Sequence, residues 1–188
     1  MDENLLQAKA PLGGRDRQIG RARLRERDEL SLVSLAIPLG GEAELADALK
    51  QVYGLDMPDP RRGRCKGDMW ALRTGPDQML LIFPHPTPDA GVHINARLST
   101  RAYVTDQTDG WVKLLLSGAA GLDALERLCP LDLELAAFPV GASARTVMEH
   151  LGVILLRLEQ DRFLLLSARS SAESFWDAVA MSCEFVVD

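Results

Sequence analysis

The chain contains 188 residues, of which 47% are hydrophobic and 26% are charged, and this composition is typical of a folded globular protein. Its formal net charge of −6 excludes an overall electrostatic attraction to nucleic acid or to an anionic membrane surface. No apolar run approaches the roughly 20 residues of a membrane-spanning helix, and the first residues lack the apolar core of a secretion signal, so we expect a cytoplasmic protein.

Residues 1–29 differ in composition from the rest of the chain. Arginine residues alternate loosely with acidic ones, and Pro11 is followed by two glycines that would interrupt a helix. One interpretation is a solvated terminus without fixed structure. The other is an N-terminal arm that becomes ordered on a partner through Leu5, Leu6 and Leu12. Both interpretations place the first regular element after residue 29.

Strand-like runs and one amphipathic helix alternate between residues 30 and 106. Leu45, Leu49 and Val52 recur at helical spacing, and Gly54 follows them as a C-terminal glycine often does. Two apolar runs that flank a Gly-Pro turn indicate a hairpin. The expected elements are a strand at 30–37, a helix at 42–53, a loop at 57–68, hairpin strands at 69–73 and 79–83, a helix at 88–98 and a strand at 101–106.

A similar series of elements follows from residue 107 to the C-terminus. Pro130 ends a helix with leucines on one side. Residues 170–173 have the capping-box spacing of a helix start, and Phe175, Trp176 and Val179 give that helix an apolar face. The expected elements are strands at 111–116, 144–148, 152–158 and 161–167, helices at 119–129 and from residue 170, and a short strand at 183–187.

The two series share an internal repeat. Arg73 matches Arg157 and Asp77 matches Asp161, each pair 84 positions apart, and the elements around these matches occur in the same order. Either half alone would bury only a marginal core. We therefore predict an α+β fold in which residues 30–188 form one domain of two pseudo-repeat halves, about 30–106 and 107–188. Each half is a strand–helix–hairpin–helix unit with mixed or antiparallel sheets.

The residues with catalytic potential do not form a recognisable set. His85 and His93 are interpreted as surface residues, whereas His150 lies at a turn and could be buried or could face a partner. The sequence has no metal-binding or phosphate-binding motif, and it lacks the dinucleotide fingerprint of an autonomous oxidoreductase. The three cysteines are too dispersed for a disulfide framework, and Cys129 at a helix end is interpreted as a packing residue.

The strongest local charge feature is a basic cluster of Arg61, Arg62, Arg64 and Lys66 in an otherwise acidic chain. Three interpretations remain open, namely a solvated loop, a site for an anionic ligand and a contact with an acidic patch on a partner. Nucleic acid is the least favoured ligand because the cluster is short and has no interleaved aromatic residues.

Asp106 and Asp109 precede Trp111 in a polar segment. Paired carboxylates can perform acid–base chemistry, but this spacing is also ordinary turn chemistry, which we favour. The turn would present Trp111 as an interface anchor. The candidate interface residues are therefore Trp111, Arg61, Arg62, Arg64 and Lys66.

Several motifs resemble the γ subunits of heterotetrameric sarcosine oxidases. They are residues 106–111, 116–118, 125–133, 138–153 and 169–176. The segments 114–118, 132–133, 139–141 and 161–165 are similar to the related aminomethyltransferase family. This resemblance implies a duplicated α+β architecture of the folate-binding, aminomethyltransferase-like type.

The resemblance also implies that the catalytic functions of the complex belong to other subunits than this chain. The complex converts sarcosine to glycine and hydrogen peroxide, and it passes a one-carbon unit to tetrahydrofolate or releases formaldehyde. The family carries FAD, FMN, NAD, zinc and tetrahydrofolate on other subunits, and it implies neither a catalytic nor a cofactor-binding residue in this chain. The expected partners are the other subunits, chiefly the large α subunit, with self-association of the isolated chain as a further expectation. The alternatives are a stand-alone folate-binding, aminomethyltransferase-like protein and a scaffold in an unrelated complex.

Overall fold

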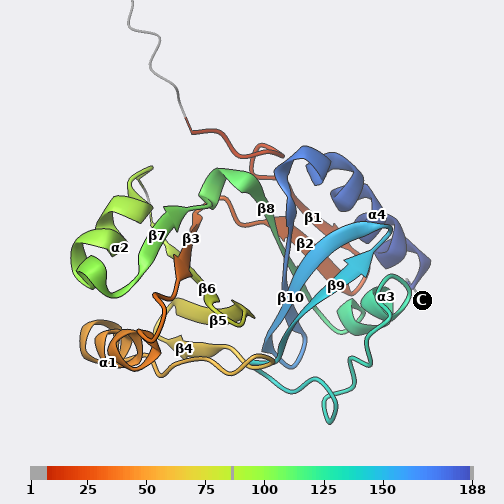
Figure 1. Ribbon diagram of the computed structural model, residues 1–188. Helices are drawn as coiled ribbons and strands as arrows, with labels where there is room; N and C mark the ends of the chain where they lie inside the picture. The colour runs from red at the N-terminus through yellow and green to blue at the C-terminus, as the bar shows by residue number, and fades with distance from the viewer. Residues whose placement is uncertain (1–7, 86, 187–188) are drawn as a thin grey trace, which may run out of the picture.

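Two antiparallel sheets face one another and helices cover their outer sides (Figure 1). The computed structural model describes residues 8–85 and 87–186. Within these residues one sheet has the strand order β1-β2-β8-β11-β10-β9, and the other has the order β4-β5-β6-β3-β7. We call them sheet A and sheet B. None of the helices in the described ranges is long and apolar enough to cross a membrane.

Sheet A contains the N-terminal hairpin and most strands of the second half. Its strands are β1 (Asp16–Ile19), β2 (Ala22–Glu26), β8 (Trp111–Ser117), β9 (Ser143–Met148), β10 (Leu151–Glu159) and β11 (Arg162–Ala168). Sheet B is built from β3 (Leu30–Ala36), β4 (Arg64–Lys66), β5 (Met69–Gly75), β6 (Gln78–Pro84) and β7 (Tyr103–Asp106). Helices α1 (Glu42–Tyr53) and α2 (Ala90–Leu98) pack on sheet B, and α3 (Gly121–Glu126) and α4 (Ala172–Phe185) pack on sheet A.

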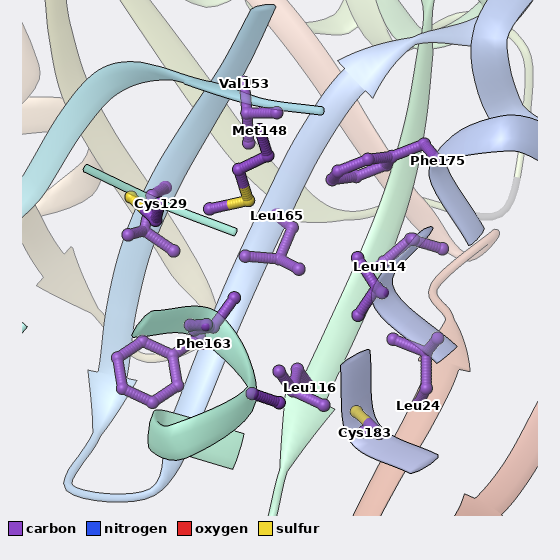
Figure 2. Packing of buried hydrophobic residues seen from close by; sticks show 14 of the residues in the cluster. Leu24, Leu114, Leu116, Cys129, Met148, Val153, Phe163, Leu165, Phe175 and Cys183 are labelled. Atoms are coloured by element: carbon purple, nitrogen blue, oxygen red, sulfur yellow. The ribbon is translucent and has the colours of Figure 1, made fainter. Parts of the chain in front are cut away.

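Three apolar clusters hold these layers together. One lies between sheet A and its helices, where Leu114, Phe163 and Phe175 are fully buried. Figure 2 shows where these side chains lie relative to the strands and helices. A second lies between sheet B and its helices. The third fills the space between the two sheets with side chains such as Leu32 and Leu156. Both faces of the central strands are therefore buried, and each fully buried leucine contributes roughly 2 kcal/mol.

The structure confirms most of the expected elements. The helix predicted at 42–53 is α1, and Gly54 ends it in the left-handed conformation with a φ of 66°. The hairpin predicted at 69–83 is β5–β6. The predicted loop at 57–68 contains the short strand β4, and the predicted helix at 119–129 is shortened to α3.

The expectation of an arm at residues 1–29 is wrong for its described part. Leu12 is buried, and residues 16–26 form the β1–β2 hairpin, whose β2 pairs with β8. Buried and exposed side chains alternate along β2. Ala22, Leu24 and Glu26 are buried, whereas Arg23 and Arg25 are exposed. Residues 30–188 therefore do not form a complete domain without this hairpin. The leucines at 5 and 6 lie outside the described residues.

The predicted strand at 183–187 is also wrong over its described residues. Helix α4 continues to Phe185, and Val179 and Cys183 lie fully buried on the same face. The helical spacing of these two positions therefore outweighs the β-forming residues at the end of the chain. Ser171 is the N-cap residue of α4, but its side chain makes no capping hydrogen bond.

The two hairpins predicted to be related share their register. Arg73 pairs with Met79 in β5–β6, and Arg157 pairs with Phe163 in β10–β11. In both hairpins the register shifts directly after the arginine. The strand orders β4-β5-β6-β3-β7 and β9-β10-β11-β8-β2 also correspond position by position, so β2 lies beside β8 as β7 lies beside β3.

Gly118 allows the N-terminal hairpin to lie close to the end of β8. Its φ is +103°, and a Cβ atom at this position would lie 2.2 Å from the carbonyl oxygen of Arg21. We expect Gly118→Ala to lower the free energy of unfolding by about 3 kcal/mol or more, because both the backbone angle and the close contact exclude a side chain. Urea denaturation measures this loss.

Gly152→Ala is the matched control, because a Cβ atom there meets nothing within 4 Å. We expect this control to change the free energy of unfolding by no more than about 0.5 kcal/mol. Equal stability of the two variants would contradict the close approach of the hairpin to β8.

Candidate docking surface

The side chain of Arg157 organises the long segment between α3 and β9. It is only 1% exposed, and its Nη1 atom donates hydrogen bonds of 2.8 Å to the carbonyl oxygens of both Leu133 and Phe138. Its Nε and Nη2 atoms donate to the carbonyl oxygen of Gln160 at 3.1 and 2.7 Å. The guanidinium also stacks 4.9 Å from the ring centroid of Phe163. One buried cation thus fixes three carbonyl groups, two in the segment before β9 and one in the turn between β10 and β11.

The backbone of Arg157 continues this network to the join between the sheets. Its carbonyl oxygen accepts a 2.8 Å hydrogen bond from the Gly141 amide, and its amide donates to the Ala142 carbonyl at 3.0 Å. Gly141 accepts a hydrogen bond from the Gly63 amide at 2.8 Å, and Arg62 forms an isolated bridge with Ala142. The position of the basic loop therefore depends on Arg157 in the other half of the chain.

The structure separates the members of the predicted basic cluster. Arg64 forms an ion pair with Asp59, with 2.7 Å between Nη2 and Oδ2. Lys66 lies against Gly54 at the end of α1. Arg61 and Arg62 are exposed and have no ion pair within the described part of the chain. Lys66 is also exposed, so Arg61, Arg62 and Lys66 remain available to an external group.

Trp111 has a role inside the fold. It is the first residue of β8, it is half-buried, and its ring packs on the cluster between the sheets together with Trp70 and Leu158. The exposed part of Trp111 lines a cavity of about 330 Å3 at the opening of the space between the sheets. None of Arg61, Arg62, Arg64 and Lys66 lines this cavity, so the structure does not gather the predicted interface residues at one point.

A groove connects the two regions. A second cavity of about 500 Å3 is bounded by Pro60 and Leu72, and it shares Thr74, Arg145 and Ile154 with the cavity beside Trp111. Arg145 is exposed and lies on the edge strand β9. The sequence analysis did not single out Arg145. An isolated arginine in a predicted strand gives no signal until the strand order shows that the strand lies at an edge.

The remaining polar candidates have structural explanations. Burial would raise the pKa of Asp106, but hydrogen bonds from Thr108 and from the Gly91 amide outweigh it and lower the pKa, as expected of a turn residue. His150 is exposed in the β9–β10 turn with a φ of 67°. His85 was predicted to lie at the surface; it is half-buried beside His93, and its Nε2 atom lies 2.8 Å from Oδ1 of the exposed Asp89.

Cysteines and metal ligands add no reactive site among the described residues. Cys129 is buried in the core of sheet A, which agrees with its predicted packing role. Burial raises the pKa of the Cys183 thiol to about 11, which disfavours the reactive thiolate. No group of three potential metal ligands lies close enough together within the described ranges.

Two buried charged groups, which were not predicted from the sequence, hold the N-terminal part of the chain in place. Glu26 is 1% exposed and accepts hydrogen bonds from the amides of Leu12 at 3.0 Å and Gly14 at 2.7 Å. Lys113 is 4% exposed and donates to the carbonyl oxygen of Leu30 at 3.1 Å. Desolvation lowers the pKa of Lys113, although nearby carboxylates oppose this shift.

Comparison with known proteins first defines the fold class. No protein-family profile matches the chain. The fold is shared with the glycine cleavage system aminomethyltransferase T from Bartonella henselae, with a TM-score of 0.58 and 14% identity over 85% of this chain and 45% of that chain. It is also shared with a chain of heterotetrameric sarcosine oxidase from Corynebacterium sp. U-96, with a TM-score of 0.78 and 22% identity over 92% of this chain and 88% of that chain.

A curated relative then gives the family. The sarcosine oxidase subunit gamma of Corynebacterium sp. (strain P-1) is 31% identical over 170 residues, which cover 87% of this chain and 81% of the relative. The chain belongs to the family of sarcosine oxidase γ subunits.

The Arg157 network leads to a stability prediction. We expect Arg157→Met to lower the free energy of unfolding by about 3 kcal/mol or more, because three carbonyl groups lose their donors. Arg157→Lys should recover only part of this loss, since one ammonium cannot replace the guanidinium fork. Arg162→Met removes an exposed ion pair with Glu159 and should cost less than about 1 kcal/mol. Urea denaturation compares the three, and equal losses would contradict the network.

Lys113 predicts a specific pH dependence. Its pKa is lower in the folded chain than the ordinary value of 10.5, so the unfolded chain binds more protons as the pH approaches that value. The unfolding free energy of the native chain minus that of Lys113→Met should therefore rise as the pH increases towards 10.5. The raised pKa of Cys183 acts in the opposite direction, but it cancels in this difference. The exposed Lys66→Met control should show no such rise, and a flat difference for Lys113→Met would contradict the assignment.

Proposed function

We propose that this chain is the γ subunit of a heterotetrameric sarcosine oxidase and that it contributes structure and contact area. The observation that carries this proposal is the 31% identity to a sarcosine oxidase γ subunit over 87% of the chain. The complex would oxidise sarcosine to glycine with release of hydrogen peroxide, and it would form 5,10-methylenetetrahydrofolate or formaldehyde. The flavins, NAD and tetrahydrofolate would be bound by the larger subunits and zinc by the smallest, and the chief partner of this chain would be the large α subunit.

Exposed apolar residues support a role in assembly. Met181 and Phe185 are 57% and 68% exposed at the end of α4, beside a cavity of about 440 Å3 that Leu128 and Leu151 also line. Val147 on β9 is 51% exposed. Such residues are candidates for burial against another subunit, or against a second copy when the chain is isolated.

We further propose that the fold arose from a duplicated unit. The matching registers of β5–β6 and β10–β11 support this proposal, as does the corresponding order of the two sheets. The bonds of the two arginines support it as well, because Arg73 Nη2 donates to the carbonyl oxygen of Pro76 and Arg157 Nη2 donates to that of Gln160, again 84 positions apart. In the second unit, the N-terminal β2 would hold the position beside β8 that β7 holds beside β3.

Co-purification from the source cell tests the proposed assembly. We expect the tagged chain to recover a flavin-containing large subunit, whereas the isolated chain should show no flavin absorbance. Recovery of an unrelated complex would contradict the proposal. Stoichiometric binding of tetrahydrofolate by the isolated chain, measured by calorimetry, would instead favour the stand-alone folate-binding alternative.

A pair of tryptophan variants tests the role proposed for Trp111. We expect Trp111→Ala to weaken assembly about tenfold or more, because aromatic side chains contribute strongly to interfaces. Trp70→Ala is the matched control, since Trp70 packs on the same cluster from sheet B. Affinity for the remaining subunits and the melting temperature of each isolated variant are measured. If Trp111→Ala and Trp70→Ala lose the same affinity and the same stability, Trp111 acts only as a packing residue.

A further inference from the structure

The outer edge of β9 carries unpaired backbone groups. β9 is the last strand of sheet A and pairs with β10 on one side only. The Ser143 amide points away from β10, because it donates a 3.0 Å hydrogen bond to the carbonyl oxygen of Arg61. Backbone groups alternate along a strand, and the register of β9 with β10 is regular, so the amides of Arg145 and Val147 point the same way. No backbone acceptor meets either amide within residues 8–85 and 87–186.

β9 differs from the other edge strands. β9 has six residues, whereas the edge strands β1, β4 and β7 have four, three and four. Short edge strands discourage pairing with another chain, whereas a longer edge with β-branched residues such as Thr146 and Val147 favours it. Beside this edge lies the cavity of about 500 Å3 lined by Leu72 and Ile154, which offers space for apolar side chains.

The charge at this edge is opposite to that of the whole chain. Arg61, Arg62 and Arg145 are exposed around the start of β9, and none of them has an ion pair in the part of the chain that the structure describes. The neighbouring Arg64 and Arg73 are already neutralised by Asp59 and Glu42. An unneutralised basic edge in a chain of net charge −6 is complementary to an acidic partner.

We propose that the edge of β9 receives an extended, acidic segment of another subunit as an additional strand of sheet A. This proposal rests on the proposed role as a γ subunit and assigns a surface to it. Backbone hydrogen bonds from Arg145 and Val147 would hold the segment. Acidic side chains would pair with the three free arginines, and an alternating apolar side chain would enter the neighbouring cavity.

Proline substitutions test the backbone part of the proposal. Val147→Pro removes an outward amide without removing a bond to β10, so the isolated chain should keep its melting temperature within a few degrees. Its affinity for the remaining subunits should fall about tenfold or more. Gln18→Pro is the matched control on the edge strand β1, where the Gln18 amide also points outward by the same alternation from the Ile19–Ala22 pair. The control should assemble as the native chain does.

Charge reversal tests the complementarity. Arg145→Glu should weaken assembly about tenfold and reduce its dependence on salt, whereas Arg97→Glu on the exposed face of α2 should do neither. Hydrogen exchange gives a direct readout, because the amides of Arg145 and Val147 should be exchangeable in the isolated chain and protected in the complex.

The outcomes separate this inference from the proposed function. If the native chain fails to recover the other subunits, the proposed function is wrong. If Val147→Pro and Arg145→Glu both assemble as well as the native chain does, the edge does not receive a strand. The charge of Arg145 would then only prevent unwanted pairing of this edge with other strands. Unchanged exchange of the two amides, or equal defects in the two proline variants, would also overturn the inference. The inference would also be overturned if Val147→Pro and Arg145→Glu assembled as the native chain does and inorganic phosphate stabilised the native chain. That result would indicate a site for a small anion.

Discussion

The fold depends on the burial of one positive charge without a carboxylate partner. Arg157 is almost completely excluded from solvent, and carbonyl oxygens of Leu133, Phe138 and Gln160 take the place of water around its guanidinium. A guanidinium can satisfy several carbonyl groups at once because its donors are fixed in a plane. The cost of burying the charge is offset only while all of these carbonyl groups stay in position. The irregular segment before β9 is therefore held as firmly as a regular element.

The hydrogen bonds around Arg157 also join the two sheets at their edges. The backbone of Arg157 positions Gly141 and Ala142, and these residues bond to the loop that carries Arg61 and Arg62. At the other side of the molecule, β7 of sheet B leads through a short turn into β8 of sheet A. On the side opposite this covalent turn, the sheets can separate only if the hydrogen bonds from Gly63 to Gly141 and from Ser143 to Arg61 break, which would expose the apolar cluster between the sheets.

The sequence predicted the regular elements because apolar periodicity dominates them, as α1 and the β10–β11 hairpin show. It failed for β2, where alternating arginines hid the buried Ala22 and Leu24, and where the partner strand β8 lies far away in the chain. It failed at the end of α4, where local β propensity competed with a helical face that only tertiary packing reveals. The candidate site was predicted only in part, because charge clusters in sequence do not show which arginines find internal partners.

A chain with no evident reactive set among its described residues can still serve a catalytic complex through the surface that it presents. Its ionisable groups in the interior, Glu26, Lys113 and Arg157, all bond to backbone groups and thus fix loops. Beside β9, Arg61, Arg62 and Arg145 have no ion pair among the described residues, and they surround a strand that still has free backbone groups. The buried charges thus hold loops in place, whereas these three exposed arginines can be reached by another chain. This arrangement supports the role in assembly that we propose.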